Sequence, residues 1–159
     1  MSQLGAGVTA RAAISLPGET GRTANDWVPV LADIPLFRNL SGRHLKRVAS
    51  LARMRRYGPG TSIVRTGDSA SAFFVLIDGT ARVVTAKGRA RRLRSGDFFG
   101  EMALFDDSPR SADVIADGEV LTMTISRNAF GKLLRSEPAL AQELLRTLAA
   151  RLRAAEKAV

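Results

Sequence analysis

The chain has 159 residues, of which 45% are apolar and 25% are charged. This length suits one domain with a hydrophobic core and excludes disorder over the whole chain. The absence of cysteine excludes a disulfide framework, a thiol nucleophile and a cysteine-based zinc site. The longest apolar run, residues 72–77, is too short to span a bilayer, and the N-terminus lacks a secretory hydrophobic segment. We therefore expect a cytoplasmic protein without a membrane segment.

The net charge of +9 is distributed unevenly along the chain. Residues 43–94 contain 13 Lys and Arg residues and only two acidic residues, Asp68 and Asp78, whereas the rest of the chain is slightly acidic. Such a basic region is typical of a nucleic-acid or membrane-surface footprint, but also of a solvated face in an arginine-rich sequence. Composition favours the solvated face and leaves the other interpretation open.

The N-terminal part of the chain is predicted to contain an arm and then helices. Residues 1–25 are small, polar and without a sustained period, so we expect a flexible arm before a single domain at residues 26–159. Asp26 is expected to cap a short helix, and Ser41 a second, amphipathic one. The Tyr-Gly-Pro-Gly motif at residues 57–60 is expected to end helical character.

From residue 61 the sequence has the period of strands. Short β-branched or aromatic segments predict six strands, at residues 62–64, 73–77, 81–85, 90–93, 112–116 and 120–125. Glycine-containing turns separate them, and Asp117-Gly118 is the strongest hairpin signal. Short strands at this spacing without alternating helices predict a mainly β fold, an antiparallel jelly roll or barrel.

Two helices are predicted after the strands. Ser126 is expected to cap the first, which ends before Pro138, and Glu137-Pro138 opens a longer second helix. The second helix has one apolar stripe, formed by Leu140, Ala141, Leu144, Leu145, Leu148 and Leu152. The predicted architecture is therefore N-terminal helices, an antiparallel β-barrel and two C-terminal helices.

The segment GDFFGEMALFDDSPRSA at residues 96–112 does not look like ordinary barrel filling. Its helix-compatible residues after Gly100 predict one helical turn, whose free backbone N–H groups and dipole favour an anion. Arg110 adds a fork of donors that suits two phosphate oxygens. Glu101 is an acceptor beside this anion site, which fits a ligand with a hydroxyl, such as a ribose. The alternative is a Glu101–Arg110 salt bridge that holds the loop together.

The sequence FGEMALFDDSPRSADVIA closely resembles the phosphate-binding cassette of cyclic nucleotide-binding domains, which reads F-G-E-(L/M)-A-L followed by P-R-(S/T/A)-A. The similarity extends from about residue 30 to the end and includes Pro35-Leu36-Phe37, Gly67-Asp68 and the C-terminal helices. It implies a stand-alone bacterial member of the family, a regulatory receptor that is not an enzyme. The C-terminal helices would act as its lid.

The resemblance also implies roles for individual residues. Glu101 would accept a hydrogen bond from the ribose 2′-OH beside the Gly100 backbone, and Arg110 would pair with the exocyclic phosphate oxygens. The phosphate cradle would be completed by backbone N–H groups of Ala103 and of Ser111 or Ala112. Met102 and Val83 would form an apolar wall for the base, with ordinary core packing as the alternative for both. Leu104 would pack near Phe130 as a hydrophobic hinge contact.

The hydroxyl of Ser111 suits a phosphate or a guanine amino group, so it does not distinguish cAMP from cGMP. Bacterial members of the family favour cAMP, and the resemblance therefore implies cAMP as the ligand, with cGMP as the alternative. The bacterial transcription-factor branch contacts adenine with a Thr-Ser pair, where this chain has Ala154-Ala155. Stacking of Arg151 or Arg153 over the base is an alternative. No metal or cofactor is implied. The expected partner is a protein or a second copy of the chain, bound through the C-terminal helix.

No arrangement of nucleophile and base suggests an enzyme. The only histidine, His44, lies among basic residues and is expected on the surface. DNA binding is not expected, because the chain ends at Val159 without room for a helix-turn-helix. The second hypothesis is a protein-interaction or nucleic-acid-binding module that uses the basic residues 43–94 and has a degenerate pocket. The intact Gly100, Glu101 and Arg110 argue against it.

Overall fold

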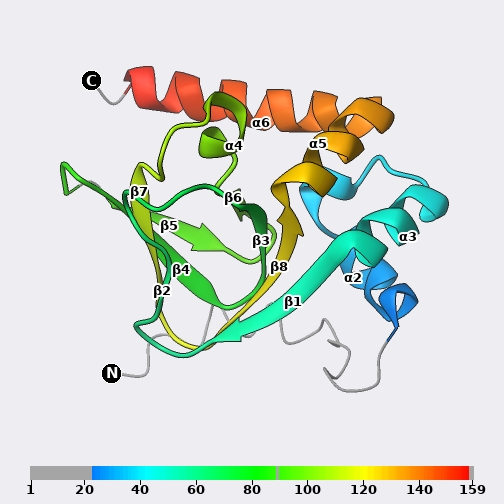
Figure 1. The fold of residues 1–159 in the computed structure, drawn as a ribbon, viewed down its shortest axis with the longest axis horizontal. Helices are drawn as coiled ribbons and strands as arrows, with labels where there is room; N and C mark the ends of the chain where they lie inside the picture. The colour runs from blue at the N-terminus through cyan, green and yellow to red at the C-terminus, as the bar shows by residue number, and fades with distance from the viewer. Residues whose placement is uncertain (1–22, 89, 158–159) are drawn as a thin grey trace.

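The computed structural model describes residues 23–88 and 90–157. Two four-stranded antiparallel sheets form its centre, and most of the helices gather beside one of them (Figure 1). The strand order is β1-β8-β3-β6 in the first sheet and β2-β7-β4-β5 in the second. This confirms the predicted mainly β, antiparallel jelly-roll fold with flanking helices. Most of the predicted arm, residues 1–22, lies outside the described residues.

The strands of the described chain are short and follow the predicted segments, with two additions. Their bounds are β1 (Ala52–Tyr57), β2 (Ser62–Val64), β3 (Ala72–Asp78), β4 (Thr80–Thr85), β5 (Ala90–Arg94), β6 (Phe98–Phe99), β7 (Ala112–Ala116) and β8 (Val120–Ser126). The additions are β1 and β6. The sequence of β1 is arginine-rich and continues directly from a helix, so it lacks the turn signal that precedes the other strands.

The predicted hairpin at Asp117-Gly118 is wrong. The strands on either side belong to different sheets, since β7 pairs with β2 and β4 whereas β8 pairs with β1 and β3. An Asp-Gly dipeptide favours a tight turn, but it does not decide which strand becomes the hydrogen-bonded partner. Strand β8 lies between β1 and β3 in the centre of the first sheet. This position buries its apolar residues Val120, Leu121, Met123 and Ile125.

The helices lie before, within and after the strands. They are η1 (Ala24–Trp27), α2 (Val28–Ala32), η2 (Pro35–Phe37), α3 (Gly42–Leu51), α4 (Met102–Asp106), α5 (Arg127–Ser136) and α6 (Pro138–Lys157). The predicted caps Ser41 and Ser126 are confirmed, because their side chains accept from the backbone N–H groups of His44 and Ala129. Asp26 is not the first cap. Its carboxylate accepts instead from the backbone N–H of Thr23, which precedes η1, at 2.8 Å.

The hydrophobic core has two parts, which share strand β3. Phe73, Val75 and Ile77 face the cluster formed with the helices, whereas Phe74 and Leu76 face the space between the sheets. Alternate residues of a strand point to opposite faces, so β3 is buried on both sides. Figure 1 shows α5 and α6 packed at one end of this arrangement, with α6 passing beside α4. Within the described part of the chain, no helix is both long and apolar enough to cross a membrane.

Candidate functional site

The candidate site begins where β6 ends at Gly100. This glycine has a φ of +83°, a left-handed conformation that side chains rarely adopt. A Cβ at this position would lie 2.8 Å from the Arg110 Nη1 atom and 3.2 Å from a ring carbon of Phe74. The chain then forms the short helix α4, and Asp107, which follows it, has a φ of +58°. The predicted helical turn inside the strands is therefore confirmed, and only glycine leaves room for Arg110 beside it.

Arg110 is buried and held by two backbone carbonyls. Its Nη1 donates to the Gly100 carbonyl at 2.6 Å and its Nη2 to the Ala72 carbonyl at 2.7 Å. Its guanidinium carbon lies 5.7 Å from the centroid of the Phe74 ring. Burial lowers the pKa of Arg110, while the negative charges of Glu101 and Asp68 oppose this shift. Arginine remains a cation in proteins, so the site contains a fixed and oriented positive charge.

Glu101 is the second buried charged residue of the site, with 5% of its surface exposed. The alternative of a Glu101–Arg110 salt bridge is not what the structure contains, because Glu101 pairs with Arg151 of α6. Nη1 of Arg151 lies 2.8 Å from Oε1 of Glu101, and its Nη2 donates to the Phe98 carbonyl at 2.9 Å. The Arg151 guanidinium also lies over the Phe98 ring, 4.2 Å from its centroid. Burial lowers the pKa of Arg151 as well, and Glu101 opposes the shift.

These residues line one pocket. Seven of the eight residues predicted to bind the ligand contribute to its wall: Val83, Gly100, Glu101, Met102, Arg110, Ser111 and Ala112. The eighth, Ala103, lies in α4. The prediction missed the lining residues Val64, Arg91, Phe99 and Val114. Strand alternation could have indicated the apolar ones, because they belong to short strands and are buried in the cluster between the sheets. Arg91 has no such signal.

Helices α4 and α5 are in direct contact. Leu104 packs against the core cluster that contains Phe130, as predicted, and the Phe130 ring stacks on Phe73 with centroids 4.1 Å apart. Arg127, the first residue of α5, donates to the Leu104 carbonyl at 3.3 Å and to the carboxylate of Asp107. Helix α5 is therefore joined to α4 by both apolar and charged contacts.

Six of the 13 basic residues in the region 43–94 lie in two edge strands. Strand β1 contains Arg53, Arg55 and Arg56, and strand β5 contains Arg91, Arg92 and Arg94, all exposed. Charged side chains on a sheet edge discourage pairing with other sheets. Of these six, Arg91 lines the pocket. The distribution favours the interpretation of the basic region as a solvated, edge-protecting surface.

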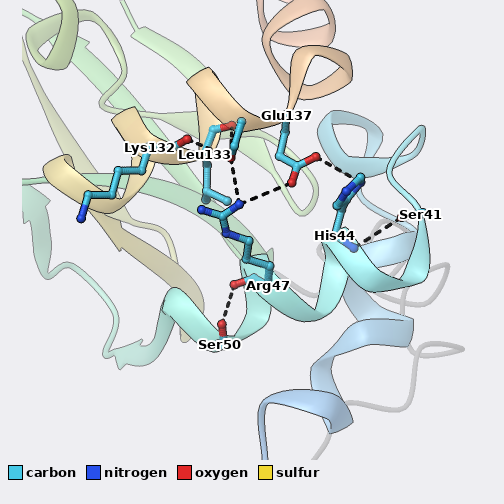
Figure 2. Close-up of polar contacts among 8 residues, drawn as sticks. Ser41, His44, Arg47, Ser50, Lys132, Leu133 and Glu137 are labelled. Carbon is cyan, nitrogen blue, oxygen red and sulfur yellow. Dashed lines mark hydrogen bonds and ion pairs between the residues drawn. The ribbon is translucent and has the colours of Figure 1, made fainter.

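His44 does not lie free on the surface. Its side chain is 35% exposed, and its Nδ1 lies 3.0 Å from Oε2 of Glu137, which is buried between α5 and α6 (Figure 2). Proximity in sequence to Arg43, Lys46 and Arg47 suggested a solvated position, but His44 occupies the face of α3 that is turned toward the helix junction. No group of three or more His, Asp or Glu residues with metal-site geometry occurs within the described ranges 23–88 and 90–157.

Comparison with known proteins places this arrangement in a family. Residues 54–137 match the family described as "Cyclic nucleotide-binding domain". The cAMP-dependent protein kinase regulatory subunit of Hypocrea atroviridis is 33% identical over 104 residues, covering 65% of this chain and 22% of the relative. A cGMP-dependent protein kinase of Caenorhabditis elegans is 35% identical over 111 residues, covering 65% and 14%. The chain therefore spans less than a quarter of either relative.

The fold comparison agrees with the sequence comparison. The regulatory domain of Toxoplasma gondii PKA, solved with cAMP, superposes with a TM-score of 0.71 at 25% identity, covering 80% of this chain and 50% of that one. The expectation of a bacterial member is corrected by these findings, since the curated relatives quoted come from a fungus and a nematode. Fold, pocket and family match agree, and the chain belongs to the cyclic nucleotide-binding domain family.

Proposed function

We propose that this domain is a receptor for a cyclic nucleotide, with cAMP as the ligand, and that binding acts on α6 to signal to a protein partner. The observation that carries the proposal is one pocket with two buried side chains of opposite charge, Glu101 and Arg110. A cyclic nucleotide carries an anionic phosphate next to a ribose hydroxyl, so it requires a cation and an acceptor side by side. The fungal relative, named as a cAMP-dependent regulatory subunit, supports cAMP.

The phosphate would bind at Arg110. A guanidinium has five N–H donors, and the two carbonyl bonds of Arg110 occupy two of them. The remaining donors are available for the exocyclic phosphate oxygens, and the carbonyl bonds hold the fork in a fixed orientation. Backbone N–H groups of Ala103 and of Ser111 or Ala112 would complete the phosphate site. A preorganised fork loses little freedom when the ligand binds, which favours affinity.

The ribose would bind at Glu101. Its Oε1 already accepts from Arg151, but an ionised carboxylate has about four acceptor positions, so the 2′-OH can bind the same group. The base would lie against Met102 and Val83, near the Arg91 side chain. cGMP is the alternative ligand, with Ser111 as its candidate contact. The lid and the ligand therefore meet at a single carboxylate.

Signalling would proceed through α6, because Arg151 connects this helix to the ligand-binding carboxylate. Leu145 and Leu152 of α6 are 65% and 61% exposed, although the sequence groups them with the buried Leu140 and Leu144. We propose that these exposed leucines contact a protein partner, of which a second copy of the chain is the simplest case. Light scattering with and without cAMP tests whether two copies of the chain associate. The receptor would form one domain from residue 26 onward, preceded by the arm.

Isothermal calorimetry with cAMP, cGMP and 5′-AMP tests the receptor function. We expect cAMP to bind most tightly and 5′-AMP most weakly, because the open phosphate carries more charge and a different shape. Arg110→Ala is expected to abolish measurable binding, while Arg53→Ala, which removes an exposed arginine on β1, leaves it unchanged. Absence of heat with all three nucleotides at high micromolar concentration would overturn the proposal. So would undiminished binding by Arg110→Ala.

A further inference from the structure

A buried carboxylate outside the pocket has no role in the function proposed above. Glu137 lies between α5 and α6 and is 3% exposed. Its Oε2 lies 3.0 Å from Nδ1 of His44, and its Oε1 lies 3.9 Å from Nη1 of Arg47. Arg47 also donates to the hydroxyl of Ser136 at 3.0 Å. Figure 2 shows these side chains of α3 pointing at the residues that end α5.

The burial of Glu137 requires these partners. A carboxylate removed from water is strongly destabilising unless cations or hydrogen-bond donors compensate for the lost hydration. An imidazole can donate to a carboxylate whether it is neutral or protonated, so the contact with His44 does not depend on one charge state. Any movement that separates the helix junction from α3 would leave Glu137 without compensation. The junction is therefore fixed to α3.

The backbone of Glu137 connects the two helices. Its N–H donates to the Leu133 carbonyl in the last turn of α5 at 2.8 Å. Its carbonyl accepts from Leu140 and Ala141 in the first turn of α6, at 3.0 and 3.2 Å. Pro138 follows and cannot continue the α5 hydrogen-bond pattern. The direction of α6 relative to α5 is thus set at the residue whose side chain is bound to α3.

The position of Arg151 is sensitive to this direction. Arg151 lies in α6, 14 residues beyond Glu137, which corresponds to about 21 Å at 1.5 Å per residue. A change of about 10° in the direction of α6 at its start would displace Arg151 by about 4 Å. A displacement of this size away from Glu101 would take Arg151 Nη1 beyond hydrogen-bond distance of the carboxylate, from which it now lies 2.8 Å. A small adjustment at the junction therefore has a large effect at the pocket.

We propose that Glu137 is a positioning residue for the lid: its contacts with His44 and Arg47 orient α6 so that Arg151 reaches Glu101. The contacts tune ligand affinity from outside the pocket, through α6 and without touching the ligand. This inference rests on the proposed function, because the lid acts at the ribose-binding carboxylate. It assigns α3 a part in setting affinity, besides its place in the core.

The first experiment compares two variants, in each of which one glutamate of this region is replaced by glutamine. Glu137→Gln retains the shape of the side chain and removes its charge, and Glu143→Gln does the same to a residue of α6 that pairs with Arg146 at 3.6 Å. We expect Glu137→Gln to weaken cAMP binding by about tenfold and to speed amide exchange in residues 149–157 without ligand. Glu143→Gln should change both by less than about twofold. His44→Gln is the second variant and should act in the same direction as Glu137→Gln.

The second experiment is a double-mutant cycle with Arg151→Ala. If Glu137 acts through the Arg151 contact, Glu137→Gln should change cAMP affinity by less than about twofold when Arg151 is already absent. Equal fold-changes in both backgrounds would overturn the proposal, as would lower thermal stability without faster exchange in residues 149–157. Failure of this proposal can be distinguished from failure of the proposed function, because amide exchange is measured without ligand. Even if the protein binds no cyclic nucleotide, the difference in exchange between Glu137→Gln and Glu143→Gln can still be measured.

Discussion

We predict that one side chain, Arg151, holds the last turns of α6 against the cassette. Among residues 149–157, Arg151 is the side chain that is not exposed, and it contacts Glu101 and Phe98 of the cassette. The substitution Arg151→Ala removes these contacts and leaves the helix backbone intact, because alanine has the highest helix propensity. We therefore expect it to release the end of α6 from the cassette without unfolding the core.

The magnitude follows from the contacts that are lost. Hydrogen bonds to charged groups contribute about 1.5–3 kcal/mol each, and a guanidinium over an aromatic ring contributes about 0.5–2 kcal/mol. The Arg151 side chain is 24% exposed, and it also loses rotamer freedom when it is held, so the net effect is smaller than the sum. We expect about 2–3 kcal/mol, which corresponds to about 30- to 150-fold faster exchange at these amides.

Amide hydrogen exchange followed by mass spectrometry measures this release, with Arg153→Ala as the control for an exposed arginine on the same helix. The melting temperature should fall by less than about 2 °C, because the released turns contain little of the core. Exchange in residues 149–157 that is no faster in Arg151→Ala than in Arg153→Ala would refute the reasoning. A large global destabilisation by Arg151→Ala would refute it too.

Three further predictions concern the cassette, the buried ring of Phe130 and one carboxylate. Gly100→Ala places a Cβ 2.8 Å from the Arg110 guanidinium at a residue with a φ of +83°. Calorimetry should therefore show at least about tenfold weaker cAMP binding. The control Gly42→Ala has open space around its Cβ and should bind cAMP normally. Phe130→Ala should cost about 3–5 kcal/mol in urea unfolding, since the ring is 1% exposed; a loss below about 1 kcal/mol would contradict this. A backbone N–H and a hydroxyl donate to Asp113 and lower its pKa, so its stabilising effect is present above about pH 4 and lost in more acidic solution. Melting curves of wild type and Asp113→Asn should therefore converge below that pH, and a constant difference would contradict the assignment.

The cassette could be predicted because its signals are local. Gly100, Glu101 and Arg110 lie within eleven residues, and each has one chemical reason to be there: a left-handed backbone, an acceptor and a fork of donors. The same holds for the caps at Ser41 and Ser126, which bond to backbone N–H groups three residues away. Period and capping operate over a few residues, so a single sequence is sufficient to identify them.

Strand pairing could not be predicted in the same way. Asp117-Gly118 predicted a hairpin, yet β7 and β8 separate into different sheets because each buries its apolar residues against other partners. Strand β1 follows α3 without a turn signal and is identified by its pairing with β8. A strand partner depends on burial summed over the whole sheet, and local propensity contributes little to that sum.

The sequence by itself determined the fold class, the cassette and most of the pocket wall, because periodicity and short motifs specify structure over a few residues. Only the tertiary structure decided which charges meet. Arg151 lies 50 residues from Glu101, and His44 belongs to a helix far from Glu137 in sequence. A buried charge must find a partner, and the geometry of the packed helices determines which one is within reach. The contact between Arg151 and Glu101 and the contacts at the helix junction are therefore properties of the folded domain.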